Sequence, residues 1–220
     1  MAGPSALTAR CAEPVVRVDA LVKRYRHRQA LAGVSLQVAR GELYGLIGAD
    51  GAGKSSLFKA VAGVLSFEGG TLRVFGQGIA SESDAERVKQ RIGFMPQGLG
   101  LNLYPELSVD ENIDFFADLR GVPPRARQER KARLLAMTRL EAFRARPMKQ
   151  LSGGMKQKLG LACTLIHEPE LIVLDGPTTG VDPLSRRNFW NLIYEMSKAG
   201  TPAFVTTPYV DEAADCDRLG

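Results

Sequence analysis

A glycine-rich stretch followed by lysine and serine restricts the fold of this chain more than any other feature. Residues Gly48-Ala49-Asp50-Gly51-Ala52-Gly53-Lys54-Ser55 match the pattern G-x-x-x-x-G-K-[ST], with an apolar run before them and a predicted helix after them. Glycines let backbone N–H groups curl around phosphate oxygens, and the helix directs its positive N-terminal end at the same anions. The stretch therefore predicts a phosphate-binding loop between a strand and a helix.

A second feature fits the first. The apolar run Leu171–Leu174 is typical of a parallel strand buried on both faces, and Asp175 follows it. Open α/β sheets bind ligands in the crevice at the carboxyl ends of their strands. We expect Lys54 to contact the β- and γ-phosphates of a nucleotide, with Ser55 and Asp175 as ligands of Mg²⁺.

Hydrophobic periodicity places strands at both ends of the chain and helices in the middle. This order predicts an α/β core that carries a helical insertion, after a flexible tail at residues 1–14. Ser108 and Glu111 form a capping box that starts a helix reaching about residue 119. The other expected helices cover residues 125–137, the segment after Gly154, and 183–198. Strands are expected at 15–19, 34–38, 43–47, 71–75, 92–95, 171–174 and 203–206.

Composition excludes several classes of protein. No apolar run approaches the roughly 20 residues that a membrane-spanning helix needs, and the N-terminus does not resemble a signal peptide. The three cysteines Cys11, Cys163 and Cys216 are far apart, which argues against a disulfide framework or a zinc site. Cys163 lies in an apolar run and is expected in the core.

Positive charge is concentrated in one segment. Residues 120–158 contain twelve Lys or Arg but only two acids, a local charge of +10 in a chain whose net charge is +5. Such a segment could face anionic lipid headgroups, an acidic partner or RNA, or it could be a solvated helical face. Both interpretations stay open from the sequence.

The stretch Leu151-Ser152-Gly153-Gly154-Met155-Lys156-Gln157 resembles the signature sequence of ATP-binding-cassette (ABC) proteins. The resemblance implies a head-to-tail dimer in which Ser152, Gly153 and Gly154 grip the γ-phosphate of ATP held by the opposite subunit. Tyr25 resembles the aromatic residue that stacks on adenine, and Gln97 the glutamine that reaches Mg²⁺ and senses the membrane partner. Asp182 lies in a stretch that resembles the loop crossing the dimer interface.

These motifs occur in family order and cover nearly the whole chain. They imply a P-loop NTPase core with a mainly parallel sheet, an antiparallel β subdomain and a helical signature subdomain at about 98–160. The ABC ATPase domain is expected to span 15–220 and to be incomplete at its C-terminal end. The resemblance implies that ATP and Mg²⁺ bind through the loop residues Gly48, Ala49, Asp50, Gly51, Ala52, Gly53, Lys54, Ser55 and Ser56.

The chain departs from the family at two positions. Gly176 stands where the family has the glutamate that polarises the attacking water, and glycine has no side chain to accept a proton. Pro208 stands where the family has a histidine that contacts the γ-phosphate, and proline can donate no hydrogen bond. The two histidines His27 and His167 do not substitute and are expected at the surface. We therefore expect this chain's own site to bind ATP but to hydrolyse it slowly.

Two functions remain open from the sequence. The wording of the motifs resembles bacterial drug-export ATPases, including the first half of tandem-ATPase exporters. This favours an ATPase on the cytoplasmic face of the membrane that works with a second ABC ATPase domain and an integral membrane permease. The alternative is a non-transport ATP-binding module of the same fold that acts on ribosomes or in regulation.

Overall fold

A parallel sheet lies at the centre of the structure, a computed structural model that describes residues 13–98, 100–214 and 216–220. Every pairing between neighbouring strands of this sheet in the described residues is parallel, so their carboxyl ends meet at one edge. In spatial order its strands are β6 (Ile92–Met95), β7 (Leu171–Leu174), β8 (Ala203–Thr206), β3 (Leu43–Leu46) and β9 (Arg218–Leu219).

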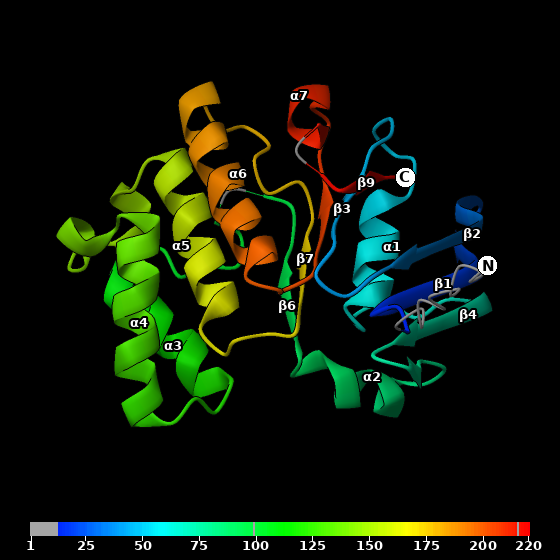
Figure 1. Ribbon diagram of the computed structural model, residues 1–220, viewed down its shortest axis with the longest axis horizontal. Coiled ribbons are helices and arrows are strands. Elements are labelled where there is room, and N and C mark those ends of the chain that lie inside the picture. Colours follow the sequence, from blue (N-terminus) through cyan, green and yellow to red (C-terminus); the bar gives the residue numbers. More distant parts are fainter. Residues whose placement is uncertain (1–12, 99, 215) are drawn as a thin grey trace, which may run out of the picture.

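An antiparallel sheet lies at one end of the molecule (Figure 1). Helix α1 (Lys54–Val61) connects the two sheets, because its buried Leu57, Phe58 and Val61 share one apolar cluster with residues of both. The order of the antiparallel strands is β2 (Arg28–Val38), β1 (Val16–Tyr25), β4 (Gly69–Val74) and β5 (Gln77–Gly78).

Four longer helices cover the face of the parallel sheet that lies away from α1 (Figure 1). Strand β7 shows why both faces are covered: Leu171 and Val173 pack toward α1, whereas Leu174 packs in a second cluster with the helices. These helices are α3 (Val109–Leu119), α4 (Pro124–Thr138), α5 (Gly153–Leu165) and α6 (Pro183–Lys198). The shorter elements are α2 (Glu82–Lys89), α7 (Val210–Ala213) and the 3₁₀ turns Glu141–Phe143 and Met148–Gln150.

The predicted α/β class, with a parallel sheet, an antiparallel sheet and a helical part, is confirmed. Strands β6, β7 and β8 and helices α3 and α6 have the bounds expected from the sequence. Strands β1 and β2 are longer than expected. Bulges near Ala20, which has a φ of 48°, break the two-residue alternation on which the prediction depended.

Helix α2 was not expected. It buries only Ala85 and Val88, so its apolar face is too narrow to show as a helical period. The capping box that starts it joins Ser81 to Asp84, an aspartate in place of the usual Glu or Gln.

Half of the twelve basic side chains in segment 120–158 form ion pairs within the described residues. The acidic partners lie just outside the segment, so its charge of +10 overstates the net positive charge of this part of the surface. Residues 106–168 contain twelve basic and eight acidic side chains. The structure therefore supports a solvated, ion-paired face for half of these basic side chains, and an interaction of the segment with a partner stays a prediction. The pairs are Arg127 with Asp118, Arg130 and Arg133 with Glu168, Lys131 with Asp114, Arg144 with Asp110, and Lys149 with Glu106.

Three further expectations concern the ends and the core of the chain. Residues 1–12 of the predicted tail, with Cys11, lie outside the described residues. Cys163 is buried, as expected, and burial raises the pKa of its thiol. Across the ranges that the structure describes, no helix is both long and apolar enough to span a bilayer.

The centre of the α1 cluster offers a test of the packing. Phe204 in β8 is fully buried, and its ring centroid lies 4.1 Å from that of Phe58 and 5.4 Å from that of Tyr44. We expect Phe204→Ala to lower the free energy of unfolding by about 3–5 kcal/mol, because the cavity cannot fully collapse. Thermal unfolding should show a melting temperature lower by roughly 10 °C. The control is Phe115→Ala on the surface of α3, and an equal loss in both variants would contradict the packing.

Candidate functional site

The loop between β3 and α1 has the geometry that its glycines predict. Gly51 and Gly53 have φ values of 79° and 96°, a region that glycine enters at little cost. A Cβ on Gly53 would lie 2.1 Å from the carbonyl oxygen of Ala30, so only glycine fits there. Gly53 caps α1 without a side-chain hydrogen bond, which leaves the first N–H groups of the helix to a ligand. Lys54 Nζ donates to the carbonyl oxygens of Gly48 and Ala49, over 2.7 and 2.9 Å.

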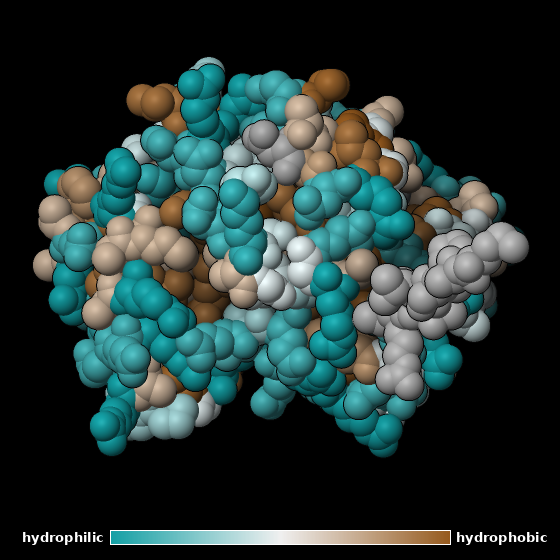
Figure 2. Space-filling model, in the orientation of Figure 1, coloured by the Kyte–Doolittle hydropathy of each residue, from teal (hydrophilic) through white to brown (hydrophobic). Residues whose placement is uncertain are grey.

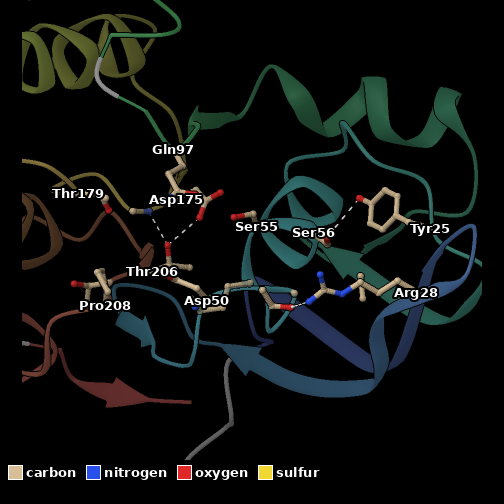
Figure 3. Close-up of a pocket in the computed structure, with 16 residues that line it drawn as sticks. Tyr25, Arg28, Asp50, Ser55, Ser56, Gln97, Asp175, Thr179, Thr206 and Pro208 are labelled. Carbon is tan, nitrogen blue, oxygen red and sulfur yellow. Dashed lines mark hydrogen bonds between the residues drawn. The ribbon is translucent and has the colours of Figure 1, made fainter.

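A pocket of about 340 Å³ opens beside this loop (Figure 3). The residues that line it are far apart in the sequence but lie at or near the ends of elements that are neighbours in the fold. Eleven candidates from the sequence line it: Tyr25, Asp50, Gly51, Gly53, Lys54, Ser55, Ser56, Gln97, Asp175, Gly176 and Pro208. Five lining residues were missed: Arg28, Ala30, Thr179, Thr206 and Thr207. Gly48, Ala49 and Ala52 belong to the loop without lining the pocket.

Asp175 is held by the neighbouring strand. It is only 3% exposed, and its Oδ1 accepts a hydrogen bond of 3.0 Å from the Thr206 hydroxyl. The same hydroxyl accepts a bond of 2.6 Å from the backbone N–H of Gly176. Figure 3 shows Asp175 facing the side of the pocket where Ser55 lies. A hydroxyl and a carboxylate can hold Mg²⁺ when nucleotide phosphates supply further oxygens, so these side chains fit that ion.

Gly176 and Pro208, the two positions at which the sequence analysis expects departures from the family, both line this pocket. Gly176 has a φ of 54°, and a Cβ placed on it would lie 3.0 Å from Thr179 Oγ1 and 3.5 Å from Gln97 Nε2. Thr179 Oγ1 is buried and has no hydrogen-bond partner among the described residues. Pro208 lies two residues after the end of β8 and also lines the pocket. Neither position carries a group that can accept a proton from water.

Glu212, which the sequence analysis did not single out, is buried near the pocket and accepts several hydrogen bonds, so we call it the hub. Its carboxylate accepts hydrogen bonds from Thr178, over 3.0 and 2.9 Å, and from Thr207. Arg186 lies 3.4 Å from the same carboxylate and stacks on Tyr209, 3.8 Å from the ring centroid. The hub therefore joins the loop after β7 to the segment after β8. A lone Glu in a short polar helix gives no sequence signal for this role.

The signature residues lie outside the pocket, at the start of α5. Ser152 caps that helix, since its Oγ accepts from the N–H of Met155 over 3.3 Å. A Cβ on Gly154 would lie 2.6 Å from the side chain of Ser185, so α5 approaches α6 closely. Asp182 caps α6 through the N–H of Ser185, and this bond lowers the pKa of the Asp182 carboxyl. These residues form a surface of their own, and their role toward a partner's nucleotide stays a prediction.

The histidines do not contribute to the pocket. His27 is exposed, as expected, but the expectation that His167 lies at the surface is wrong. His167 is half-buried and contacts the Ile92 carbonyl oxygen at 3.3 Å. Burial, with the charge of Arg120 nearby, lowers the pKa of its imidazole to about 4. It is therefore neutral at physiological pH, because its pKa lies well below 7.

Known proteins resemble this chain in sequence. The probable multidrug ABC transporter ATP-binding protein YbhF of Escherichia coli is 42% identical over 207 residues, which are 93% of this chain and 35% of that protein. The daunorubicin/doxorubicin resistance ATP-binding protein DrrA of Streptomyces peucetius is 37% identical over 205 residues, 93% of this chain and 61% of that protein. The chain thus spans about one third to two thirds of the length of these relatives.

Solved structures resemble the chain in fold. CbiO1 of Clostridium perfringens, part of the ABC transporter complex cbiONQ, superimposes with a TM-score of 0.85 at 28% identity, over 94% of this chain and 84% of that one. The dimeric bacterial cassette MJ0796 gives a TM-score of 0.83 over 93% and 92%, and its 24% identity supports the fold alone. The ABC transporter family model matches residues 31–179. With that match across most of the chain, and the phosphate loop and Asp175 placed in one pocket, this chain belongs to the ABC transporter family of ATP-binding proteins.

Proposed function

We propose that this chain is the ATP-binding component of an ABC exporter. It couples ATP binding and hydrolysis to export through a membrane permease, and its own hydrolytic site is degenerate. The observation that carries the proposal is the pocket in which Lys54, Ser55 and Asp175 meet Gly176 and Pro208. The names of the relatives, which include drug-resistance and multidrug ATP-binding proteins, support the export of a small molecule.

The pocket is suited to a nucleotide triphosphate with Mg²⁺. The N-terminus of α1 offers free N–H groups to the phosphates, and Lys54 adds a positive charge beside them. Ser55 and Asp175 would hold Mg²⁺, which neutralises phosphate charge when bound. Tyr25, 44% exposed at the rim of the pocket, is placed to stack on the base.

Slow hydrolysis follows from the same pocket. A general base contributes about 10²–10⁴ in rate, and the glycine and proline at positions 176 and 208 supply none. The intact signature at Ser152–Gly154 does not line this pocket and would complete a site on a partner. We therefore infer an asymmetric pair, in which this chain holds ATP and the partner's phosphate loop carries the faster site.

The edge at the carboxyl ends of the strands is suited to a second ABC ATPase domain. Leu184, at the start of α6, is 70% exposed and Val210, at the start of α7, is 75% exposed. Figure 2 shows hydrophobic surface over the ends of α6 and α7 at this edge. Covering these side chains against a head-to-tail partner removes apolar area from water and favours association.

A separate apolar patch is suited to the permease. It lies close in sequence to the exposed Gln97 and includes Leu101, 78% exposed, and Leu119, 66% exposed. Tyr104 in the loop and Phe115 in α3 contact each other edge to face, with ring centroids 4.5 Å apart. Docking here would hold the chain on the cytoplasmic face of the membrane. The basic segment 120–158 would suit either lipid headgroups or RNA and does not decide between the two functions. Co-purification with a membrane protein instead of ribosomal subunits tests the choice of a permease.

Nucleotide binding can be tested directly by calorimetry. We expect Lys54→Ala to weaken the affinity for MgATP by at least tenfold, because a charge-assisted contact to phosphate is lost. The control is Lys59→Ala, an exposed lysine in the last turn of the same helix. That variant should bind MgATP like the unchanged protein. Equal affinity in all three proteins would remove the assignment of the loop.

The cause of slow hydrolysis can be tested by restoring both missing groups. We expect Gly176→Glu combined with Pro208→His to raise ATP turnover by about two orders of magnitude, the usual contribution of a general base. The control is Gly176→Gln with Pro208→His, which keeps the size of the side chain at position 176 and the new histidine but lacks the carboxylate. Turnover is measured by phosphate release. Vigorous hydrolysis by the unchanged protein, or an equal rise in the glutamine control, would refute the idea.

A further inference from the structure

Arg28 stands beside Tyr25 at the rim of the nucleotide pocket. Strands β1 and β2 are joined by a turn of two residues, and Tyr25 and Arg28 are directly paired across it. Directly paired residues of antiparallel strands project from the same face of a sheet, with Cβ atoms about 5 Å apart. Both side chains line the pocket. The hairpin therefore presents an aromatic ring and a guanidinium together.

The guanidinium reaches the phosphate loop. Arg28 Nη2 donates a hydrogen bond of 2.8 Å to the carbonyl oxygen of Gly51 (Figure 3). A Cβ on Gly51 would lie 2.8 Å from the same nitrogen, and the φ of 79° also requires glycine, so the loop leaves room for this arginine. One N–H is used in this bond, and a guanidinium has five. The remaining donors are available to a ligand in the pocket.

Arg28 supplies one of the positive charges in the lining of the pocket. Among the described residues that line the pocket, the cationic side chains are Arg28 and Lys54, and the anionic ones are Asp50 and Asp175. Lys54 contacts carbonyl groups at the start of the loop, whereas Arg28 contacts the loop on the side of the hairpin. Arg28 is therefore one of two positive side chains that offset the two carboxylates and can attract a phosphate ester.

We propose that Arg28 is an additional nucleotide-binding residue, which contacts the ribose and α-phosphate between the base and the phosphate loop. Its place between Tyr25 and Gly51 carries this assignment. The inference rests on the proposed function, because it assumes that the pocket holds ATP. Since ribose and α-phosphate are common to all adenine nucleotides, Arg28 grips ATP and ADP equally. This contact would help a slow site to retain its nucleotide.

The experiment compares ATP, ADP and AMP on four proteins, by calorimetry and by displacement of a fluorescent ATP analogue. The proteins are the unchanged chain and the variants Arg28→Ala, Arg28→Lys and Arg24→Ala. Arg24 is the control, because it is exposed on β1 and does not line the pocket. We expect Arg28→Ala to weaken all three nucleotides by about tenfold, the usual effect of losing one charge-assisted hydrogen bond. Arg28→Lys should recover part of the loss, and Arg24→Ala should change affinity less than twofold.

Three outcomes would overturn the proposal. Unchanged affinities in Arg28→Ala would show that Arg28 makes no contact that contributes to nucleotide binding. A loss for ATP and ADP without a loss for AMP would mean that Arg28 only shapes the phosphate loop through Gly51. AMP that fails to displace the analogue from the unchanged protein would also contradict it. Failure of the unchanged protein to bind ATP would instead refute the proposed function, so the two failures are distinguishable.

Discussion

The hydroxyl of Thr206 connects the carboxyl ends of β7 and β8, where the nucleotide pocket opens. It donates to the carboxylate of Asp175 and accepts from the N–H of Gly176, and all three residues are buried. Buried hydrogen bonds are strengthened by the low local dielectric, so this one fixes the direction of the carboxylate as well as the position of its strand. Because β3, which leads into the phosphate loop, is the next strand of the sheet, the distance from Asp175 to that loop depends on this arrangement.

Glu212 extends the same ordering away from the pocket. Its bonds to Thr178 and Thr207 hold the two segments that border Gly176 and Pro208, and Arg186 adds a contact from α6. The segment after β8 is therefore anchored through its neighbours, although Pro208 itself can donate no hydrogen bond. If the family's histidine is missing at Pro208, as we propose, a contact to the ligand is lost while the anchor of the segment remains. The hydrogen bonds of Glu212 thus hold these two segments in place whether or not positions 176 and 208 carry catalytic side chains.

The sequence was sufficient wherever one short segment determined the structure. Glycine spacing identified the phosphate loop, unbroken apolar runs identified β7 and β8, and the capping box identified the start of α3. Features that depend on distant residues were not predictable. Arg28 lies among several basic residues, and only the folded hairpin places it against Gly51. The ion pairs of segment 120–158 were likewise not predictable, since the acidic partners Glu106, Asp114 and Glu168 lie outside the segment in the sequence.

The backbone at position 176 gives the proposed asymmetry a physical basis. A φ of 54° costs most side chains on the order of 1–3 kcal/mol, and glycine avoids this cost. A glutamate at this position would combine backbone strain with a close approach to Thr179, whose hydroxyl would have to give way. Such strain persists only where surrounding structure over-determines it, as the Thr206 and Glu212 hydrogen bonds do for this loop. Under the proposed function, glycine at position 176 thus has two effects: it provides no base, and it avoids the backbone strain in this loop. Lys54, Ser55 and Asp175 still line the pocket in which they would hold a nucleotide.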